Sequence, residues 1–180
     1  MKYAIIVGSH RAKSQSSKVG KIVAQFIKQV DKTAKTYILD LRKNPLPLWD
    51  ESAWEPKGKL TKIWKPYSRN LKQADAFVII SPEWSGMVPA GLKNFFLLCG
   101  NHELAYKPAM IVTVSASRGG AYPVAELRMS SYKNTYISYI PEHIIVRNAE
   151  KVFNDTTLNE TDKADFYLKK RTMYGLKILK

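Results

Sequence analysis

Residues 3–17 have the sequence YAIIVGSHRAKSQSS, and this stretch decides the fold. An uninterrupted apolar run ends at Gly8, and a polar loop then leads into a segment whose apolar residues recur at helical spacing as far as Val30. Such a run is typical of a strand buried on both faces, as in parallel sheets covered by helices. The stretch therefore predicts a strand, a loop and a helix of an α/β protein.

The same alternation continues along the chain. Further apolar runs predict strands at 36–39, 76–80, 110–114 and 144–146, and amphipathic segments predict helices at 60–71, 89–99, 124–132 and 161–179. We expect the helix over 60–71 to be interrupted or bent at Pro66. The pattern predicts one domain, residues 1–180, built on a parallel sheet with helices on both faces. Ligands bind such sheets beyond the carboxyl ends of the strands, which selects the loops 8–17, 81–86 and 115–120.

Composition excludes several classes of protein. The chain has 180 residues, a net charge of +14, one cysteine and three histidines. These numbers exclude a disulfide framework and a cysteine-rich zinc site, and the widely spaced histidines predict no metal site. No apolar run approaches the roughly 20 residues of a membrane span. The first strand begins too early for a signal peptide, so we expect a cytoplasmic protein.

The positive charge is concentrated in residues 1–75, which hold 16 basic and 6 acidic residues. The lysines recur at helical spacings rather than in a block, a pattern typical of solvated helix faces. We therefore do not expect nucleic acid as a partner.

The first loop contains hydroxyl groups and a guanidinium at the predicted start of a helix. Ser9, Arg11, Ser14 and Ser16 lie where unpaired helix N–H groups and the helix dipole favour an anion. Charge-assisted hydrogen bonds from this loop favour a phosphate monoester. The alternative is that Ser14 or Ser16 only caps the helix.

The other two loops offer an aromatic group and close backbone approach. Trp84 follows the strand over 76–80, where a planar heteroaromatic ligand could lie against it; alternatively it plugs the end of the strand. Gly119 and Gly120 would allow backbone N–H groups to approach a ligand, although the loop could be an ordinary turn.

Two motifs in these loops resemble those of the NADPH-dependent FMN reductase family, which includes quinone, azo-dye and chromate reductases. The first motif is Gly8-Ser9-x-Arg11-x-x-Ser14, and the second is Ser81-Pro82-Glu83-Trp84-Ser85-Gly86-x-x-Pro89-x-x-Leu92-Lys93-Asn94. The resemblance extends to about residue 147. It implies a flavodoxin-like three-layer sandwich whose five-stranded parallel sheet has the order 2-1-3-4-5, with helices on both faces.

The resemblance also implies a non-covalently bound FMN and NAD(P)H as co-substrate. Ser9, Arg11, Ser14 and Ser16 would hold the phosphate; Pro82, Glu83, Trp84, Ser85 and Gly86 would line one side of the flavin; Ser115, Ser117 and Gly119 would approach its pyrimidine edge. Hydride would pass through the flavin to free flavin, a quinone or a similar small acceptor. The chemistry would belong to the flavin, so no catalytic side chain is expected.

The chain departs from the family pattern in several places, among them Ser16, where the family more often has Asn, and His10, at a position that is often apolar. Trp84-Ser85 replaces the usual Tyr-Asn, and residues 95–98 replace two residues followed by Asp-Trp in a helix that builds subunit contacts in relatives. A homodimer or homotetramer is the expected assembly. Two alternatives remain: a flavin-binding electron carrier or regulatory protein without efficient NAD(P)H turnover, and a basic polyanion-binding protein on the same fold.

Other residues have simpler interpretations. Cys99 lies on the apolar face of its helix and is predicted to be inert core. Glu103 is expected to cap a helix end at the surface. Trp49, Trp54 and Trp64 fit a lid, a subunit contact or the packing of a long loop.

Overall fold

The computed structural model describes residues 1–180 as a five-stranded parallel sheet with the order β2-β1-β3-β4-β5. The strands are β1 (Lys2–Val7), β2 (Lys35–Asp40), β3 (Ala76–Pro82), β4 (Pro108–Val114) and β5 (Ser138–Val146). All four pairings between neighbouring strands are parallel. The predicted sheet and strand order are confirmed.

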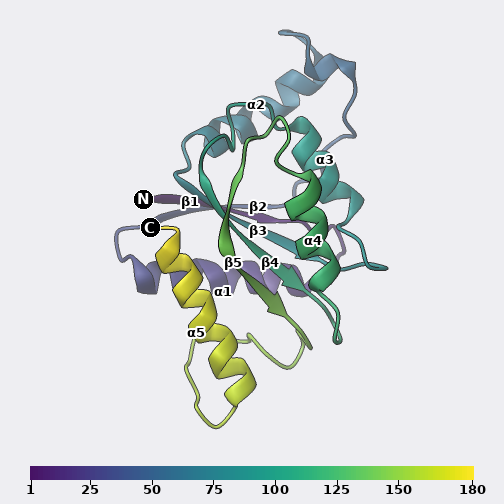
Figure 1. Ribbon diagram of the computed structural model, residues 1–180. Coiled ribbons are helices and arrows are strands. Elements are labelled where there is room, and N and C mark those ends of the chain that lie inside the picture. The colour runs from purple at the N-terminus through teal and green to yellow at the C-terminus, as the bar shows by residue number, and fades with distance from the viewer.

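Helices cover both faces of the sheet (Figure 1). One face holds α1 (Gln15–Val30) and α5 (Lys163–Ile178), and the other holds α2 (Lys59–Lys72), α3 (Ala90–Leu98) and α4 (Ala121–Ser130). A short 3₁₀ helix, η1 (Glu51–Ala53), precedes α2. The three layers form because the central strands β1, β3 and β4 are buried on both faces, and the helices cover them with their apolar faces.

The alternation of side chains along β1 explains the two hydrophobic cores. Tyr3, Ile5 and Val7 belong to the core under α1 and α5, whereas Ala4 and Ile6 belong to the core under α2 and α3. Successive residues of a strand point to opposite faces, so one continuous apolar run supplies both cores.

Two predicted elements differ from the structure. The helix α2 continues through Pro66, which is exposed, so water can reach the carbonyl group that the missing proline N–H leaves free. Strand β5 begins at Ser138 rather than at residue 144. Its middle contains Pro141, Glu142 and His143 between apolar residues, as an edge strand permits. No helix combines the length and apolarity needed to cross a bilayer.

Candidate functional site

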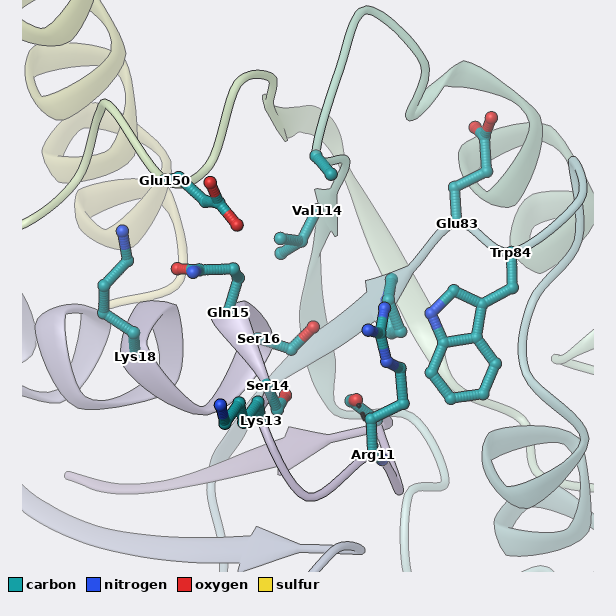
Figure 2. Close-up of a pocket in the computed structure, with 13 residues that line it drawn as sticks. Arg11, Lys13, Ser14, Gln15, Ser16, Lys18, Glu83, Trp84, Val114 and Glu150 are labelled. Atoms are coloured by element: carbon teal, nitrogen blue, oxygen red, sulfur yellow. Dashed lines mark hydrogen bonds between the residues drawn. The ribbon is translucent and has the colours of Figure 1, made fainter.

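A cavity of about 520 Å³ lies at the carboxyl edge of the sheet, where β1, β3 and β4 end. Figure 2 shows side chains from the first loop, the ends of β3 and β4 and the loop after β5 around this space. The lining residues are Ser9, Arg11, Lys13, Ser14, Gln15, Ser16, Lys18, Pro82, Glu83, Trp84, Val114, Ala116 and Glu150. The volume lies in the range of small-molecule sites.

The first loop is shaped by its own serines. Ser14 is the N-cap of α1, and its Oγ accepts a hydrogen bond from the Ser17 N–H at 3.2 Å. Ser9 is buried, and its Oγ accepts the Arg11 N–H at 3.4 Å. The capping role considered for Ser14 is therefore present. It uses the oxygen of Ser14 as an acceptor and leaves the hydroxyl proton free to be donated.

Donors at the start of α1 remain without protein partners. The Arg11 side chain is exposed and takes part in no hydrogen bond or ion pair, and Ser16 Oγ, in a residue only 2% exposed, has no protein partner. The first turn of α1 contains no acidic residue. The helix dipole, a free guanidinium and a free hydroxyl thus converge on one end of the cavity, and this donor set fits a phosphate group.

Lys18 also lines this cavity, but its ammonium group is already engaged. Its Nζ donates hydrogen bonds to the carbonyl oxygens of Ala149 and Val152 and, at 2.7 Å, to Asn154 Oδ1. Burial lowers the pKa of Lys18. Lys18 therefore fixes the loop after β5 against α1 and shapes one wall of the cavity.

A tight turn follows β3. Trp84 and Met87 exchange two backbone hydrogen bonds of 3.1 and 2.9 Å around Ser85 and Gly86. Both central residues have positive φ, 50° at Ser85 and 74° at Gly86. A turn with two such residues favours Asn-Gly, because asparagine and glycine tolerate the left-handed region better than serine. Ser85 is exposed and does not line the cavity.

Trp84 stands at the cavity wall beside the first loop (Figure 2). The exposed His10 meets its indole edge-on, with ring centroids 4.7 Å apart and an interplanar angle of 86°. This contact orients the indole from the first loop. Trp84 is therefore a half-buried aromatic wall of the cavity.

Glu83 joins the second loop to the third. Its Oε2 accepts the Gly120 N–H at 2.6 Å, and a Cβ added at Gly119 would lie 2.5 Å from its Oε1. Gly120 has φ of 107°, in the region that favours glycine. The loop after β4 therefore needs both glycines, one for its conformation and one for the close approach of the carboxylate.

The structure brings most of the predicted site residues to one cavity. Ser9, Arg11, Ser14, Ser16, Pro82, Glu83 and Trp84 line it, whereas Ser85, Gly86, Ser115, Ser117 and Gly119 lie in the two adjoining loops outside its wall. Ser115 uses its Oγ to accept the Ser117 N–H at 3.2 Å, which shapes the third loop.

Sequence reasoning missed several lining residues, in particular Lys13, Gln15, Lys18, Val114, Ala116 and Glu150. Lys13 and Gln15 belong to the loop already selected, and their place in it was a sufficient signal. Glu150 follows β5, whose carboxyl end meets the same edge of the sheet as the other strands. The rule that ligands bind beyond the carboxyl ends of the strands, which selected three loops, also selects the loop after β5.

Known proteins resemble this chain over the part that contains these loops. Residues 1–151 match the family model for NADPH-dependent FMN reductase. The NAD(P)H-dependent FMN reductase LOT6 of Saccharomyces cerevisiae is 29% identical over 133 residues, which cover 66% of this chain and 68% of that protein. A quinone reductase of Pseudomonas putida is 26% identical over 123 residues, covering 66% of this chain and 62% of the relative.

A solved structure shows the same fold. The flavoenzyme NAD(P)H:(acceptor) oxidoreductase FerB from Paracoccus denitrificans superposes with a TM-score of 0.72 at 20% identity, over 98% of this chain and 97% of that chain. The match over residues 1–151 includes all three loops at the cavity and confirms the resemblance inferred from the two motifs. The chain belongs to the NADPH-dependent FMN reductase family.

Proposed function

We propose that this chain is a single-domain FMN-dependent NAD(P)H oxidoreductase whose flavin lies in the 520 Å³ cavity. The observation that supports this most is the unpaired donor set at the N-terminus of α1. Arg11 and Ser16 have free donors there, and no acidic residue in the first turn of the helix opposes an anion. Together with Ser9 and Ser14 they would hold the phosphate of FMN.

The ring would lie between the second and third loops. Pro82, Glu83, Trp84, Ser85 and Gly86 would form one side, and Ser115, Ser117 and Gly119 the other. The hydrogen bond from the Gly120 N–H to Glu83 holds these loops at a fixed separation. The backbone rather than titrating side chains would thus position the ring, and we propose no catalytic role for any side chain of this chain.

FMN supplies the redox chemistry, because its N5 can accept hydride from NAD(P)H and pass reducing equivalents to an acceptor. The acceptors we propose are free flavin, a quinone or a similar small molecule. Two relatives carry the names FMN reductase and quinone reductase, which supports this class. The family match favours a reductase over an electron carrier or a polyanion-binding protein.

We further propose a cytoplasmic homodimer or homotetramer. An apolar hollow of about 300 Å³ lies between α3 and α4, lined in part by Val88, Phe96 and Leu97. Leu97 and Met129 are 63% and 73% exposed. Exposed large apolar side chains beside an apolar hollow are typical of a subunit interface, and a second copy of the chain is the occupant that we propose.

Visible absorbance of the purified protein tests the function. We expect added FMN to bind and the flavin bands to bleach when NADPH is added without oxygen. Bands that persist with NADPH but bleach with dithionite would indicate a carrier. If FMN does not bind, the proposed function is wrong.

A further inference from the structure

A second cavity, of about 490 Å³, lies on the α2–α3 face beside the C-terminal end of α3. Because α3 starts near the carboxyl edge of the sheet and runs back across it, this end lies away from the proposed flavin site. Three of the four tryptophans of the chain, Trp49, Trp54 and Trp64, line the cavity. The proposed reductase activity gives none of them a role.

The indoles of Trp49 and Trp54 pack against each other and form one wall of the cavity. The rings of Trp49 and Trp54 are 4.8 Å apart and inclined at 70°, so they present surfaces in two directions. Asn94 on α3 fixes this segment: its Oδ1 accepts the Trp49 N–H and its Nδ2 donates to Pro47 O, both at 2.8 Å. Trp64 is buried on α2, whereas Trp54 is 76% exposed and can contact a ligand.

A buried carboxylate completes the cavity. Glu103, expected at the surface, is only 5% exposed. Its Oε1 accepts hydrogen bonds from Ser68 Oγ at 2.6 Å and Trp64 Nε1 at 3.3 Å, and its Oε2 accepts the Gly100 N–H at 3.0 Å. All three donors to the carboxylate are neutral; the Lys107 ammonium lies nearby and donates to the backbone oxygen of Glu103 at 3.1 Å, without an ion pair to the carboxylate. A negative charge held this way attracts a cation in a region from which water is partly excluded.

The cavity wall contains one anionic side chain, Glu103. No lysine or arginine lines the cavity, although His102 does. The neighbouring segment is mixed in charge, with exposed Asp50, Glu51 and Glu55 beside exposed Lys57 and Lys59. The indole rings and the buried carboxylate, rather than the wider surface, are therefore the features that favour a cation.

We propose that the tryptophan cavity (Trp49, Trp54, Trp64 and Glu103) binds an organic cation of the quaternary ammonium class. Indole faces attract cations through their quadrupole, and a weakly hydrated alkylammonium loses little on leaving water. The cavity is large enough for such a ligand. It offers no lysine, arginine or helix N-terminus to a phosphate, so FMN and NAD(P)H are not its ligands and the inference does not rest on the proposed redox activity. Leu97, at the proposed subunit interface, also lines this cavity.

Choline and its neutral isostere 3,3-dimethyl-1-butanol are the probes that test this inference. Both are titrated by calorimetry into the full-length protein at constant salt. Choline should bind, and the isostere, which has the same shape without the charge, should bind about tenfold more weakly. Equal affinities would show an apolar hollow without cation selectivity, and no binding of choline would show a cavity that is closed or filled by a second copy. Either result would overturn the proposal.

Two exposed residues of the same segment provide the matched variants. Trp54→Ala should weaken choline binding about fivefold, whereas Leu48→Ala, at a residue 77% exposed and outside the cavity wall, should leave it unchanged. Glu103→Gln keeps the shape and removes the charge, and should abolish the preference for choline over the isostere. Glu103 is buried, so its substitution can also affect folding. The variant of the exposed Trp54 is therefore the primary test. Unchanged choline binding in Trp54→Ala would contradict the proposal.

Discussion

The cavity at the carboxyl edge of the sheet and the tryptophan cavity are similar in size, and both have tryptophan and glutamate in their walls, but they differ in the cationic and hydroxyl groups that they offer. The cavity at the carboxyl edge of the sheet offers a free guanidinium, serine hydroxyls and the N-terminus of a helix, whereas the tryptophan cavity offers indole faces and a buried carboxylate. The net charge of +14 is common to both and decides neither. Local donors and acceptors, and the state of their pairing, therefore determine which ligand class a cavity accepts.

The largest effect is expected when the Arg11 guanidinium is removed from the cavity at the carboxyl edge of the sheet. Arg11→Ala should weaken FMN binding by about 1.5 to 3 kcal/mol, because the proposed charge-assisted hydrogen bond to phosphate is lost. The dissociation constant is measured by absorbance or fluorescence titration. Lys62→Ala, which removes an equal charge from the exposed face of α2, is the control and should change nothing. An unchanged constant in Arg11→Ala would remove Arg11 from the site.

The contact of Glu83 with Gly119 and Gly120, which joins the second and third loops, gives the next largest effect. In Gly119→Ala, the new methyl would lie 2.5 Å from Glu83 Oε1, so the hydrogen bond to Gly120 must be distorted. We expect a loss of about 1 to 3 kcal/mol in the free energy of unfolding, together with weaker FMN binding. Urea denaturation measures the first and titration the second.

Gly100→Ala in the tryptophan cavity is the matched control for that substitution. Its methyl would meet Glu103 Oε2 at 3.7 Å, an ordinary contact distance. Stability close to that of the unaltered protein is expected. Equal losses in the Gly119 and Gly100 variants would indicate that the close approach of Glu83 has no special importance.

A smaller effect, of opposite sign, is expected at the turn after β3. Ser85 has φ of 50°, a conformation that asparagine tolerates better than serine. Ser85→Asn should therefore raise the free energy of unfolding by about 0.5 kcal/mol. Ser138→Asn, at an exposed position of β5, should not reproduce the gain. A loss of stability in Ser85→Asn would argue that the side chain at this position matters more than its backbone conformation.

We expect a substitution in one cavity to have no effect on ligand binding in the other. Arg11→Ala should leave choline binding unchanged, and Trp54→Ala should leave FMN binding unchanged, because no lining residue is shared. Titration of each variant with both ligands measures this independence. Cross-effects above about twofold would show that the two regions are coupled and not separate sites.

Much of the fold could be predicted because buried strands leave a strong signal. The five apolar runs and the helices between them defined a parallel sheet covered on both faces, and the two motifs supplied its order. The beginning of β5 could not be predicted, because Pro141, Glu142 and His143 interrupt the apolar pattern on an edge strand. Nor could the continuation of α2 through Pro66, which depends on the exposure of that turn.

The candidate site was predictable in its loops but not in its contacts. The buried position of Cys99 is confirmed, and burial raises the pKa of its thiol. The Glu83 carboxylate accepts a hydrogen bond from the Gly120 N–H in the third loop, a contact that the sequence did not indicate. Glu103 is buried, whereas the sequence predicted a position at the surface. Glu83 accepts a backbone N–H from a distant loop, and Glu103 accepts side-chain donors from α2. Such long-range pairings leave no periodic pattern in a sequence.

The most direct test of the central claim compares FMN with riboflavin, which has the same ring and ribityl chain but no phosphate. Titration of both into the unaltered protein and into Arg11→Ala isolates the contribution of the phosphate site. We predict that riboflavin binds at least about tenfold more weakly than FMN, and that this difference shrinks in Arg11→Ala. Equal affinity of the unaltered protein for FMN and riboflavin would contradict the assignment of the α1 N-terminus as the phosphate site.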